Sequence, residues 1–182
     1  MTSLKVLTLK NNIVIFEPEI PENLGNIIRT CVATNSKLHL IKPFGFIFNE
    51  SLLKRSSVNY LKYLDYEIYD SLDLFFAKNK EGEFYYLTRY GKKPPSSQNF
   101  LTNKPIYLLF GKETTGLPKK LLKDNLNHDL RIPMSKNVRA LNLSNSVAIV
   151  IYEVLRQQNY PNLSFVEIQK GEDFLKNYEE NK

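Results

Sequence analysis

Three stretches of the chain place polar side chains directly after apolar runs. They extend from Glu17 to Arg29, from Phe110 to Pro118 and from Arg131 to Glu153. In α/β proteins the loops that follow buried strands are where ligands bind, because the strands hold these loops at one edge of the sheet. The three stretches are therefore the candidate functional site of this sequence.

The first stretch carries polar residues at a helical spacing. Asn23, Asn26 and Arg29 are three residues apart, which places them along one face of a helix. Arg29 is of the type that binds a phosphate or a ribose. A solvated helix face has the same spacing, and the spacing alone favours that plainer interpretation.

The second stretch begins with a glycine after a strongly apolar run. Gly111 follows residues 106–110 directly, and a glycine there allows the backbone to approach a ligand. Glu113 could accept a hydrogen bond from that ligand. The glycine spacing fits neither a dinucleotide-binding fingerprint nor a phosphate-binding loop. An ordinary strand-to-helix turn is the simpler explanation of this stretch taken alone.

The third stretch is a polar loop, residues 135–142, between an apolar segment and a run with helical spacing. Asn142 or Ser144 could cap that helix. Tyr152 could be a core aromatic residue with its hydroxyl at the surface. Each of these structural roles accounts for its residue without a ligand.

The elements that would position these stretches alternate along the chain. We expect strands at 13–16, 38–41, 66–69, 84–87, 106–110 and 130–132, and helices at 22–34, 51–64, 71–78, 117–126 and 144–159. Such alternation indicates an α/β fold with a mainly parallel sheet and helices on both faces. We expect one domain, residues 1–160, followed by a carboxyl-terminal extension, 161–182, with a weak helix at 164–178.

Composition narrows the class of partner. The net charge is +6, which favours an anionic partner and nucleic acid first, although many basic proteins bind nothing anionic. The only cysteine is Cys31, so no intrachain disulfide forms and a reducing compartment is expected. His39 and His128 have no zinc-type spacing with it. With no apolar run long enough for a membrane span and no signal-peptide core, we expect a cytoplasmic protein without metal or membrane contact.

Taken together and in order, the three stretches resemble a known family. They look like the three motifs of the SPOUT RNA 2′-O-methyltransferases. The first is Glu-Pro-Glu-Ile-Pro-Glu-Asn-Leu-Gly-Asn-Ile-Ile-Arg (17–29), and the second is Leu-Phe-Gly-Lys-Glu-Thr-Thr-Gly-Leu-Pro (109–118). The third is Arg-Ile-Pro-Met (131–134) with Asn-Leu-Ser-Asn-Ser-Val (142–147). The chain is most similar to the TrmL-like tRNA (cytidine/uridine) 2′-O-methyltransferases that act at the wobble nucleotide. The similarity runs from about residue 13 to 160. It implies a trefoil knot in the carboxyl-terminal part, which general topology rules would not suggest.

The resemblance also implies a cofactor, S-adenosylmethionine, held by the loops of the knot. Carried over onto this sequence, the cofactor-binding residues are Leu87, Gly111, Ile132, Ala140, Leu141 and Ser144. Backbone groups for the adenine edge and apolar side chains for its faces suit these residue types. Ala140 stands where the family pattern leads us to expect a serine.

The same resemblance assigns roles in methyl transfer. Arg29 matches the family's catalytic arginine, and we expect it to orient the substrate and stabilise charge, since a neutral arginine is costly. Asn26, Glu113, Asn142 and Tyr152 are further candidates for positioning the ribose, the knot loop and the site that faces the dimer partner.

The implied assembly is a homodimer in which each tRNA site is built from both chains. The helices that begin near Pro21 and Ser144 would form the interface. Basic residues would then follow the tRNA backbone and give affinity and salt dependence. These are Lys54, Arg55, Arg89, Lys92, Lys93, Lys136 and Arg139.

The function implied is methyl transfer from S-adenosylmethionine to the ribose 2′-hydroxyl of the wobble nucleotide, C or U at position 34, in a leucine tRNA. One alternative is a SPOUT 2′-O-methyltransferase for another tRNA or rRNA ribose. Another is a non-catalytic RNA-binding protein that has the knotted fold. A Rossmann-like nucleotide-binding domain is a third, but no glycine fingerprint follows residues 13–16.

Overall fold

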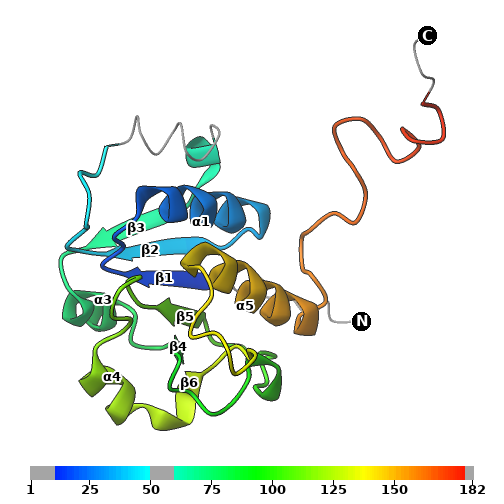
Figure 1. Ribbon diagram of the computed structural model, residues 1–182. Coiled ribbons are helices and arrows are strands. Elements are labelled where there is room, and N and C mark those ends of the chain that lie inside the picture. Colours follow the sequence, from blue (N-terminus) through cyan, green and yellow to red (C-terminus); the bar gives the residue numbers. More distant parts are fainter. Residues whose placement is uncertain (1–10, 50–59, 179–182) are drawn as a thin grey trace, which may run out of the picture.

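The computed structural model describes residues 11–49 and 60–178, and within them the strands form one sheet (Figure 1). All neighbouring strands in it are parallel, in the order β3-β2-β1-β5-β4-β6. The strands are β1 (Asn12–Phe16), β2 (Lys37–Ile41), β3 (Tyr66–Tyr69), β4 (Glu83–Leu87), β5 (Ile106–Phe110) and β6 (Asp129–Leu130). The parallel sheet predicted from the alternating pattern is confirmed.

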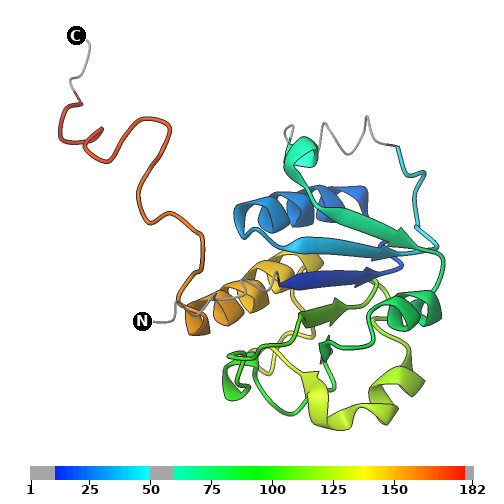
Figure 2. The ribbon, with the colours of Figure 1, turned by 180° about the vertical axis from the view of Figure 1, so that it is seen from behind.

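Helices cover both faces of the sheet, as expected (Figures 1 and 2). One face carries α1 and α5, and the other carries α3 and α4. Their bounds are α1 (Pro21–Ala33), α3 (Leu72–Lys78), α4 (Lys119–Asp124) and α5 (Leu143–Gln157), with short 3-10 turns at Tyr60–Tyr63, Pro95–Ser97 and Leu126–His128. Ser71 caps α3 as predicted, since its side chain accepts a hydrogen bond from Leu74 N.

The central strands β1 and β5 are mostly apolar because both of their faces are covered. In β1, Ile13 and Ile15 pack toward α1 and α5, while Val14 between them packs toward α3 and α4. In β5, Leu108 and Leu109 divide between the two faces in the same way. Successive side chains of a strand point to opposite faces, so a strand buried on both sides has no polar alternation.

Helices α1 and α5 lie side by side on the sheet, and their buried faces are aliphatic (Figure 1). Burying one such side chain stabilises the fold by about 1.5 to 3 kcal/mol. The buried residues include Leu24, Ile27, Ile28 and Cys31 of α1 with Val147, Val150, Ile151 and Val154 of α5. The outer faces of the two helices remain exposed to solvent.

The segment that follows β4 is bonded to β6 and to the residue after it. Thr88 N donates to Leu130 O at 2.9 Å, and Arg131 N donates to Lys93 O at 2.9 Å. A side chain at Gly91 would be blocked, because its Cβ would lie 2.6 Å from the carbonyl carbon of Leu130. These contacts hold the segment after β4 against the carboxyl-terminal part of the chain, where the resemblance implies a knot.

Three expected elements differ from the structure. The last strand ends at Leu130 rather than at residue 132, because Arg131 N already bonds to the loop after β4 and Pro133 has no N–H. The helix expected at 117–126 begins at Lys119. Residues 51–59 of another expected helix lie outside the described residues, and 60–63 form a 3-10 turn.

The carboxyl-terminal extension, 161–178, forms turns instead of the weak helix expected at 164–178. It leaves the body of the molecule beyond α5 (Figures 1 and 2). Phe165, Ile168 and Leu175 are largely exposed there. A short helix is marginal in water unless an apolar face packs against the rest of the protein, and Ile168 and Leu175 remain 76% and 82% exposed.

Candidate functional site

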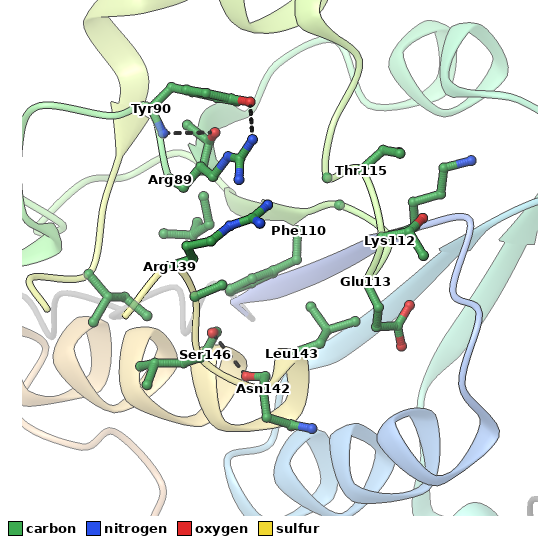
Figure 3. A pocket seen from close by; sticks show the side chains of 18 of the residues that line it. Arg89, Tyr90, Phe110, Lys112, Glu113, Thr115, Arg139, Asn142, Leu143 and Ser146 are labelled. Carbon is green, nitrogen blue, oxygen red and sulfur yellow. Dashed lines mark hydrogen bonds between the residues drawn. The ribbon is translucent and has the colours of Figure 1, made fainter. Parts of the chain in front are cut away.

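A cavity of about 610 Å³ lies at the carboxyl ends of β4 and β5 (Figure 3). Residues from all three sequence stretches line it. Its apolar lining comes from Leu87, Phe110, Ile132, Leu141 and Leu143. The ends of parallel strands are where open α/β sheets bind ligands, because the loops diverge there and leave a crevice.

A chain of hydrogen bonds through the buried Asn23, the half-buried Glu113 and the exposed Asn142 joins the three stretches beside this cavity. Asn23 Nδ2 donates to Glu113 Oε1 at 2.8 Å, and Asn142 Nδ2 donates to Asn23 Oδ1 at 2.8 Å. Asn23 is only 6% exposed, so each of its amide groups needs a partner in the protein. The link therefore fixes one residue from each stretch relative to the other two.

Asn142 also caps α5. Its Oδ1 accepts hydrogen bonds from Ser144 N at 2.9 Å, from Ser144 Oγ at 2.7 Å and from Asn145 N at 3.3 Å. Of the two caps considered from the sequence, the helix uses Asn142, and Ser144 is the first-turn residue that it holds. The same side chain thus ends the polar loop and begins the buried helix.

Glu113 lies at the amino end of α1, where the helix has no side-chain cap. The residue before α1 is Ile20, which has no side-chain acceptor, and the helix starts with Pro21. Glu113 Oε2 accepts a hydrogen bond from Glu19 N at 3.0 Å. A carboxylate at the amino end of a helix also interacts favourably with the helix dipole.

Two more glutamates tie the loop after β1 to the loop after β5. Glu19 accepts hydrogen bonds from the backbone N and from the hydroxyl of Thr114, both at 2.9 Å. Glu17 pairs with Lys112 at 2.6 Å, and this hydrogen bond raises the pKa of the lysine. The polar residues of the first stretch therefore hold the second stretch in place.

Gly111 allows a close backbone approach, but to its own loop. A Cβ on this residue would lie 2.1 Å from the carbonyl carbon of Gly116 and from Leu117 N. The chain between them is closed by a hydrogen bond from Gly116 N to Lys112 O at 3.0 Å. The sequence led us to expect room for a ligand at this glycine, whereas the structure fills that room with the loop, whose residues 112–116 line the cavity.

Opposite Glu113, the cavity has a cationic side (Figure 3). Arg89 and Arg139 lie there around Tyr90, together with Lys119 from α4. Arg89 donates to the Tyr90 hydroxyl at 2.7 Å and lowers the pKa of that phenol, with smaller effects from Lys119 and Arg139. The sequence analysis did not single out Tyr90 or Lys119 because neither belongs to a motif.

The structure brings most of the predicted site residues together, but not all. Those that line the cavity are Leu87, Gly111, Glu113, Ile132, Ala140, Leu141 and Asn142. Ser144 is buried beside it and bonded to Asn142. Asn26, Arg29 and Tyr152 lie elsewhere, on the exposed outer faces of α1 and α5.

Arg29 and Tyr152 have surroundings of their own. The guanidinium carbon of Arg29 is 5.9 Å from the centre of the Tyr60 ring. Tyr152 is 47% exposed and lines a second, shallower pocket with Tyr63, Tyr160 and Phe165. Within one chain, then, the arginine and the tyrosine lie outside the cavity formed by the three stretches.

Asn23 is a site residue that the sequence analysis only placed on a helix face. The spacing of Asn23, Asn26 and Arg29 grouped it with two exposed residues, whereas it alone is buried. What distinguishes Asn23 from Asn26 and Arg29 is its position in the first turn of α1, three residues after Ile20. This turn lies next to the loop after β5.

Among the residues that the structure describes, no group of three or more His, Cys, Asp and Glu side chains could hold a metal ion. A search of the same residues for a long, apolar helix that could cross a membrane finds none. The charged groups near the cavity are instead engaged with one another, with backbone groups or with solvent.

Comparisons with known proteins agree with this arrangement. A Geobacillus stearothermophilus relative, named provisionally as a tRNA (cytidine(34)-2′-O)-methyltransferase, is 53% identical over 154 residues, which cover 84% of this chain and 98% of the relative. The tRNA (cytidine(34)-2′-O)-methyltransferase of Yersinia pestis is 42% identical over 82% of this chain and 95% of its own length. A solved structure concerned with the 2-OH methylation of C/U34 on tRNA is 34% identical, with a TM-score of 0.77 over 83% of this chain and 97% of that one.

The family comparison covers all three stretches. The model of the SpoU rRNA Methylase family matches residues 10–152, which include the cavity and most of α5. The SPOUT resemblance and the α/β fold predicted from the sequence are therefore confirmed. The chain belongs to the SpoU rRNA methylase family.

Proposed function

We propose that this protein transfers a methyl group from S-adenosylmethionine to the ribose 2′-hydroxyl of nucleotide 34, a C or U, in tRNA. The observation that carries the proposal is the cavity in which the three family motifs meet, held by the Glu113–Asn23–Asn142 chain of hydrogen bonds. The names of relatives at 42% and 53% identity support this reaction and this nucleotide.

The cavity fits the cofactor. Its volume lies within the range of about 300 to 1,000 Å³ that is usual for small-molecule sites, and apolar side chains line it for the faces of an adenine. Backbone groups near Gly111, Ile132 and Leu141 would bind the edge of the base. When bound, S-adenosylmethionine supplies an electrophilic methyl group on a sulfonium sulfur. Ala140 is exposed, and a backbone contact there would be unaffected by the missing hydroxyl.

The chain's own groups would orient the ribose and hold the cofactor loop. The guanidinium of Arg29 would bind the ribose or a phosphate and offset the charge that develops on the 2′-oxygen. Asn142 and Glu113 would keep the loop in shape from beside the cavity. Asn26 and Tyr152 would act where Arg29 does, on the outer faces of α1 and α5.

A homodimer would bring those outer faces to a cavity. Asn26, Arg29 and Tyr152 are exposed, and so is Ile149, at 46%, on the same helix as Tyr152. Exposed apolar residues beside a functional arginine are consistent with a surface that a second copy covers. The proposed site is then assembled from the cavity of one chain and from Arg29 and Tyr152 of the other.

The substrate and the compartment follow from the same reaction. The resemblance points to leucine tRNAs as substrates. Cys31 is buried and unpaired, and burial raises the pKa of its thiol, so it needs no oxidising environment. We place the protein in the cytoplasm, where tRNA is modified and used.

The proposal is tested by incubating the purified protein with S-adenosylmethionine and total tRNA, followed by nucleoside mass spectrometry and mapping of the methylated position. We expect 2′-O-methylated C or U at position 34, with leucine tRNAs among the substrates. Methylation confined to another nucleotide would support the methyltransferase activity and contradict the assignment of nucleotide 34 as the target. No methylation of any RNA, with cofactor binding intact, would point to a non-catalytic RNA-binding protein.

Replacing Arg29 by alanine tests its role. We expect S-adenosylmethionine to bind as before, because Arg29 does not line the cavity, and methyl transfer to fall about a hundredfold or more, since an orienting charged group is lost. Single-turnover methylation and calorimetry measure the two effects. Arg29→Lys keeps the charge without the planar fork and should recover only part of the rate. Full turnover by Arg29→Ala would contradict the assignment.

A further inference from the structure

The cationic side of the cavity holds more positive charge than the cofactor can use. Arg89, Lys119 and Arg139 line it, and Arg131 lies behind Arg89, donating from its guanidinium to Arg89 O at 2.5 Å. Within the described part of the chain, none of these four forms an ion pair with a carboxylate. Like charges gathered without a counter-ion repel one another, so an anion from outside the chain is expected there.

Tyr90 holds two of these cations, Arg89 and Lys119. Its ring centre is 4.8 Å from the guanidinium carbon of Arg89 and 4.9 Å from Lys119 Nζ. Its hydroxyl accepts the hydrogen bond from Arg89, so the same residue offers the cations an electron-rich face and an acceptor. Lys119 is fixed further by donating to Thr115 O at 2.9 Å. The cations are therefore held at the rim of the cavity rather than spread into solvent.

The opposite side of the cavity does not supply the missing anion. Glu113 lies across the cavity and is already engaged with Asn23 and with Glu19 N (Figure 3). Glu19 accepts a hydrogen bond from Thr114, and Glu17 pairs with Lys112. S-adenosylmethionine has a single carboxylate and two positive groups, so it would satisfy at most one of the rim cations. A phosphodiester has the charge and the several acceptor oxygens that Arg and Lys bind together.

From this geometry we propose that Arg89, Lys119 and Arg139 bind the backbone phosphate of the RNA strand next to the ribose that is methylated, with Tyr90 as the residue that positions Arg89 and Lys119. This rests on the proposed function, because it takes the bound RNA as the substrate of the cavity. The phosphate would fix the ribose at the cavity mouth without reading the base, since phosphate contacts position a strand rather than specify its sequence.

The sharpest test compares neighbouring lysines of α4. Lys119 and Lys120 are consecutive and both exposed, but only Lys119 lines the cavity. K119Q and K120Q therefore remove the same charge from the same helix. We expect K119Q to raise KM for tRNA about tenfold and to reduce the salt slope of tRNA binding by about one, as for a lost phosphate contact, with K120Q near wild type. K119R should recover most of the affinity.

Tyr90 needs its own pair of variants. Y90F keeps the ring and loses only the hydroxyl, whereas Y90L loses the face that both cations approach. We expect Y90L to raise KM for tRNA about fivefold or more and Y90F to change it about twofold, because the ring holds two cations and the hydroxyl one. In both variants kcat at saturating tRNA should stay within about twofold of wild type, since the reacting atoms are untouched.

Calorimetry with S-adenosylmethionine separates the anion sources. Unchanged cofactor affinity in K119Q and Y90L, with weaker tRNA binding, supports the phosphate. Weaker cofactor binding with unchanged tRNA binding would overturn the proposal in favour of the cofactor's carboxylate. Equal effects of K119Q and K120Q would also overturn it, because the charge would then act only at long range. If the wild-type protein neither binds nor methylates tRNA, the proposed function itself fails. If the wild-type protein is active and the variants match it, the proposed function stands and only the phosphate site is overturned.

Discussion

At the scale of single residues, Asn142 connects the polar loop, residues 135–142, to the rest of the fold. Its oxygen caps α5 and its nitrogen reaches Asn23, so the end of the polar loop is held by two helices at once. Asn23 passes the connection on to Glu113. The residues are far apart in the chain, and the fold uses short amide and carboxylate side chains to join loops that have no backbone hydrogen bonds between them.

Replacing Asn142 by alanine should cost on the order of 2 kcal/mol, from the lost cap and from an unpaired buried oxygen on Asn23. Cofactor affinity should fall as well, because residues 139–143 line the cavity. Urea unfolding and calorimetry measure the two effects. Asn145→Ala is the matched control, because Asn145 is exposed and lies three residues later, in the first turn of α5. Equal stabilities of the two variants would mean that the cap and the link contribute little.

His39 gives a residue-scale prediction on pH. It is buried in the sheet, with Nδ1 3.0 Å from the Tyr69 hydroxyl and Nε2 3.0 Å from Asn12 Oδ1. Burial first, and then the charge of Lys37, lowers the pKa of His39 to about 4 from its ordinary 6.5, with Glu67 and Asp65 acting weakly in the other direction. Between these values the unfolded chain binds a proton that the folded chain does not, so stability falls as pH falls from 6.5 toward 4.

The expected loss between about pH 7.5 and about pH 5 is on the order of 2 kcal/mol. Unfolding in urea at the two pH values measures it, and His39→Gln should remove most of the difference. Glu67 acts in a lower window, since its hydrogen bond with Lys78 lowers the pKa of that carboxyl to about 2, and its contribution is lost only as pH falls below about 4.5. An unchanged pH dependence in His39→Gln would contradict the prediction.

At the scale of elements, the loop after β5 is closed so tightly that its first residue has no room for a side chain. Gly111→Ala would push a Cβ into the backbone of Gly116 and Leu117, so residues 112–116 must shift. We expect a stability loss of about 2 to 3 kcal/mol and cofactor binding weakened at least about tenfold. Thermal unfolding and calorimetry test both.

Gly116→Ala is the comparison for that change. Gly116 has a φ of +73° and open space around it, so an alanine there meets only backbone strain of about 1 kcal/mol. If Gly111→Ala were as mild as Gly116→Ala, the loop would be less closely packed than its geometry indicates.

Most elements were predictable because their signal is local. The apolar runs of β1 and β5 and the periodicity of α5 are written in consecutive residues, and the structure reproduces them within a residue or two. The two-residue strand β6 and the turns of the extension were not predictable from the sequence, because their conformation depends on which residues pack against them. In the site, the order of the motifs predicted Glu113 and Asn142. The roles of Asn23, Tyr90 and Lys119 depend on contacts between separate loops, and only the structure shows these contacts.

At the scale of the whole molecule, the extension is separate from the domain that the family shares. The family match ends at residue 152, and the polypeptide turns away from the sheet beyond α5 (Figure 1). Tyr160 and Leu163 still pack against the core, and the Phe165 ring contacts Tyr160, but Ile168 and Leu175 are 76% and 82% exposed. Burial therefore marks the end of the folded domain a few residues after Leu163.

Deleting residues 169–182 should change Tm by less than about 2 °C, because residues 169–178 are all exposed. Methylation of tRNA should be unchanged as well. Deleting from residue 160 onward is the contrasting variant, since it removes side chains that pack on the core, and it should lower Tm by several degrees. A large effect of the shorter deletion would show that the extension contacts RNA or a second copy.

The strand order has a consequence for how the protein is made. Strand β1 lies at the centre of the sheet, between β2 and β5, so the gap on its β5 side stays open until well over half of the chain has left the ribosome. The cavity closes later still, because its last wall is residues 139–143 and their anchor is the start of α5. A nascent chain therefore completes the cavity only when synthesis is nearly finished, and a premature stop before α5 would leave the last wall of the cavity without its anchor.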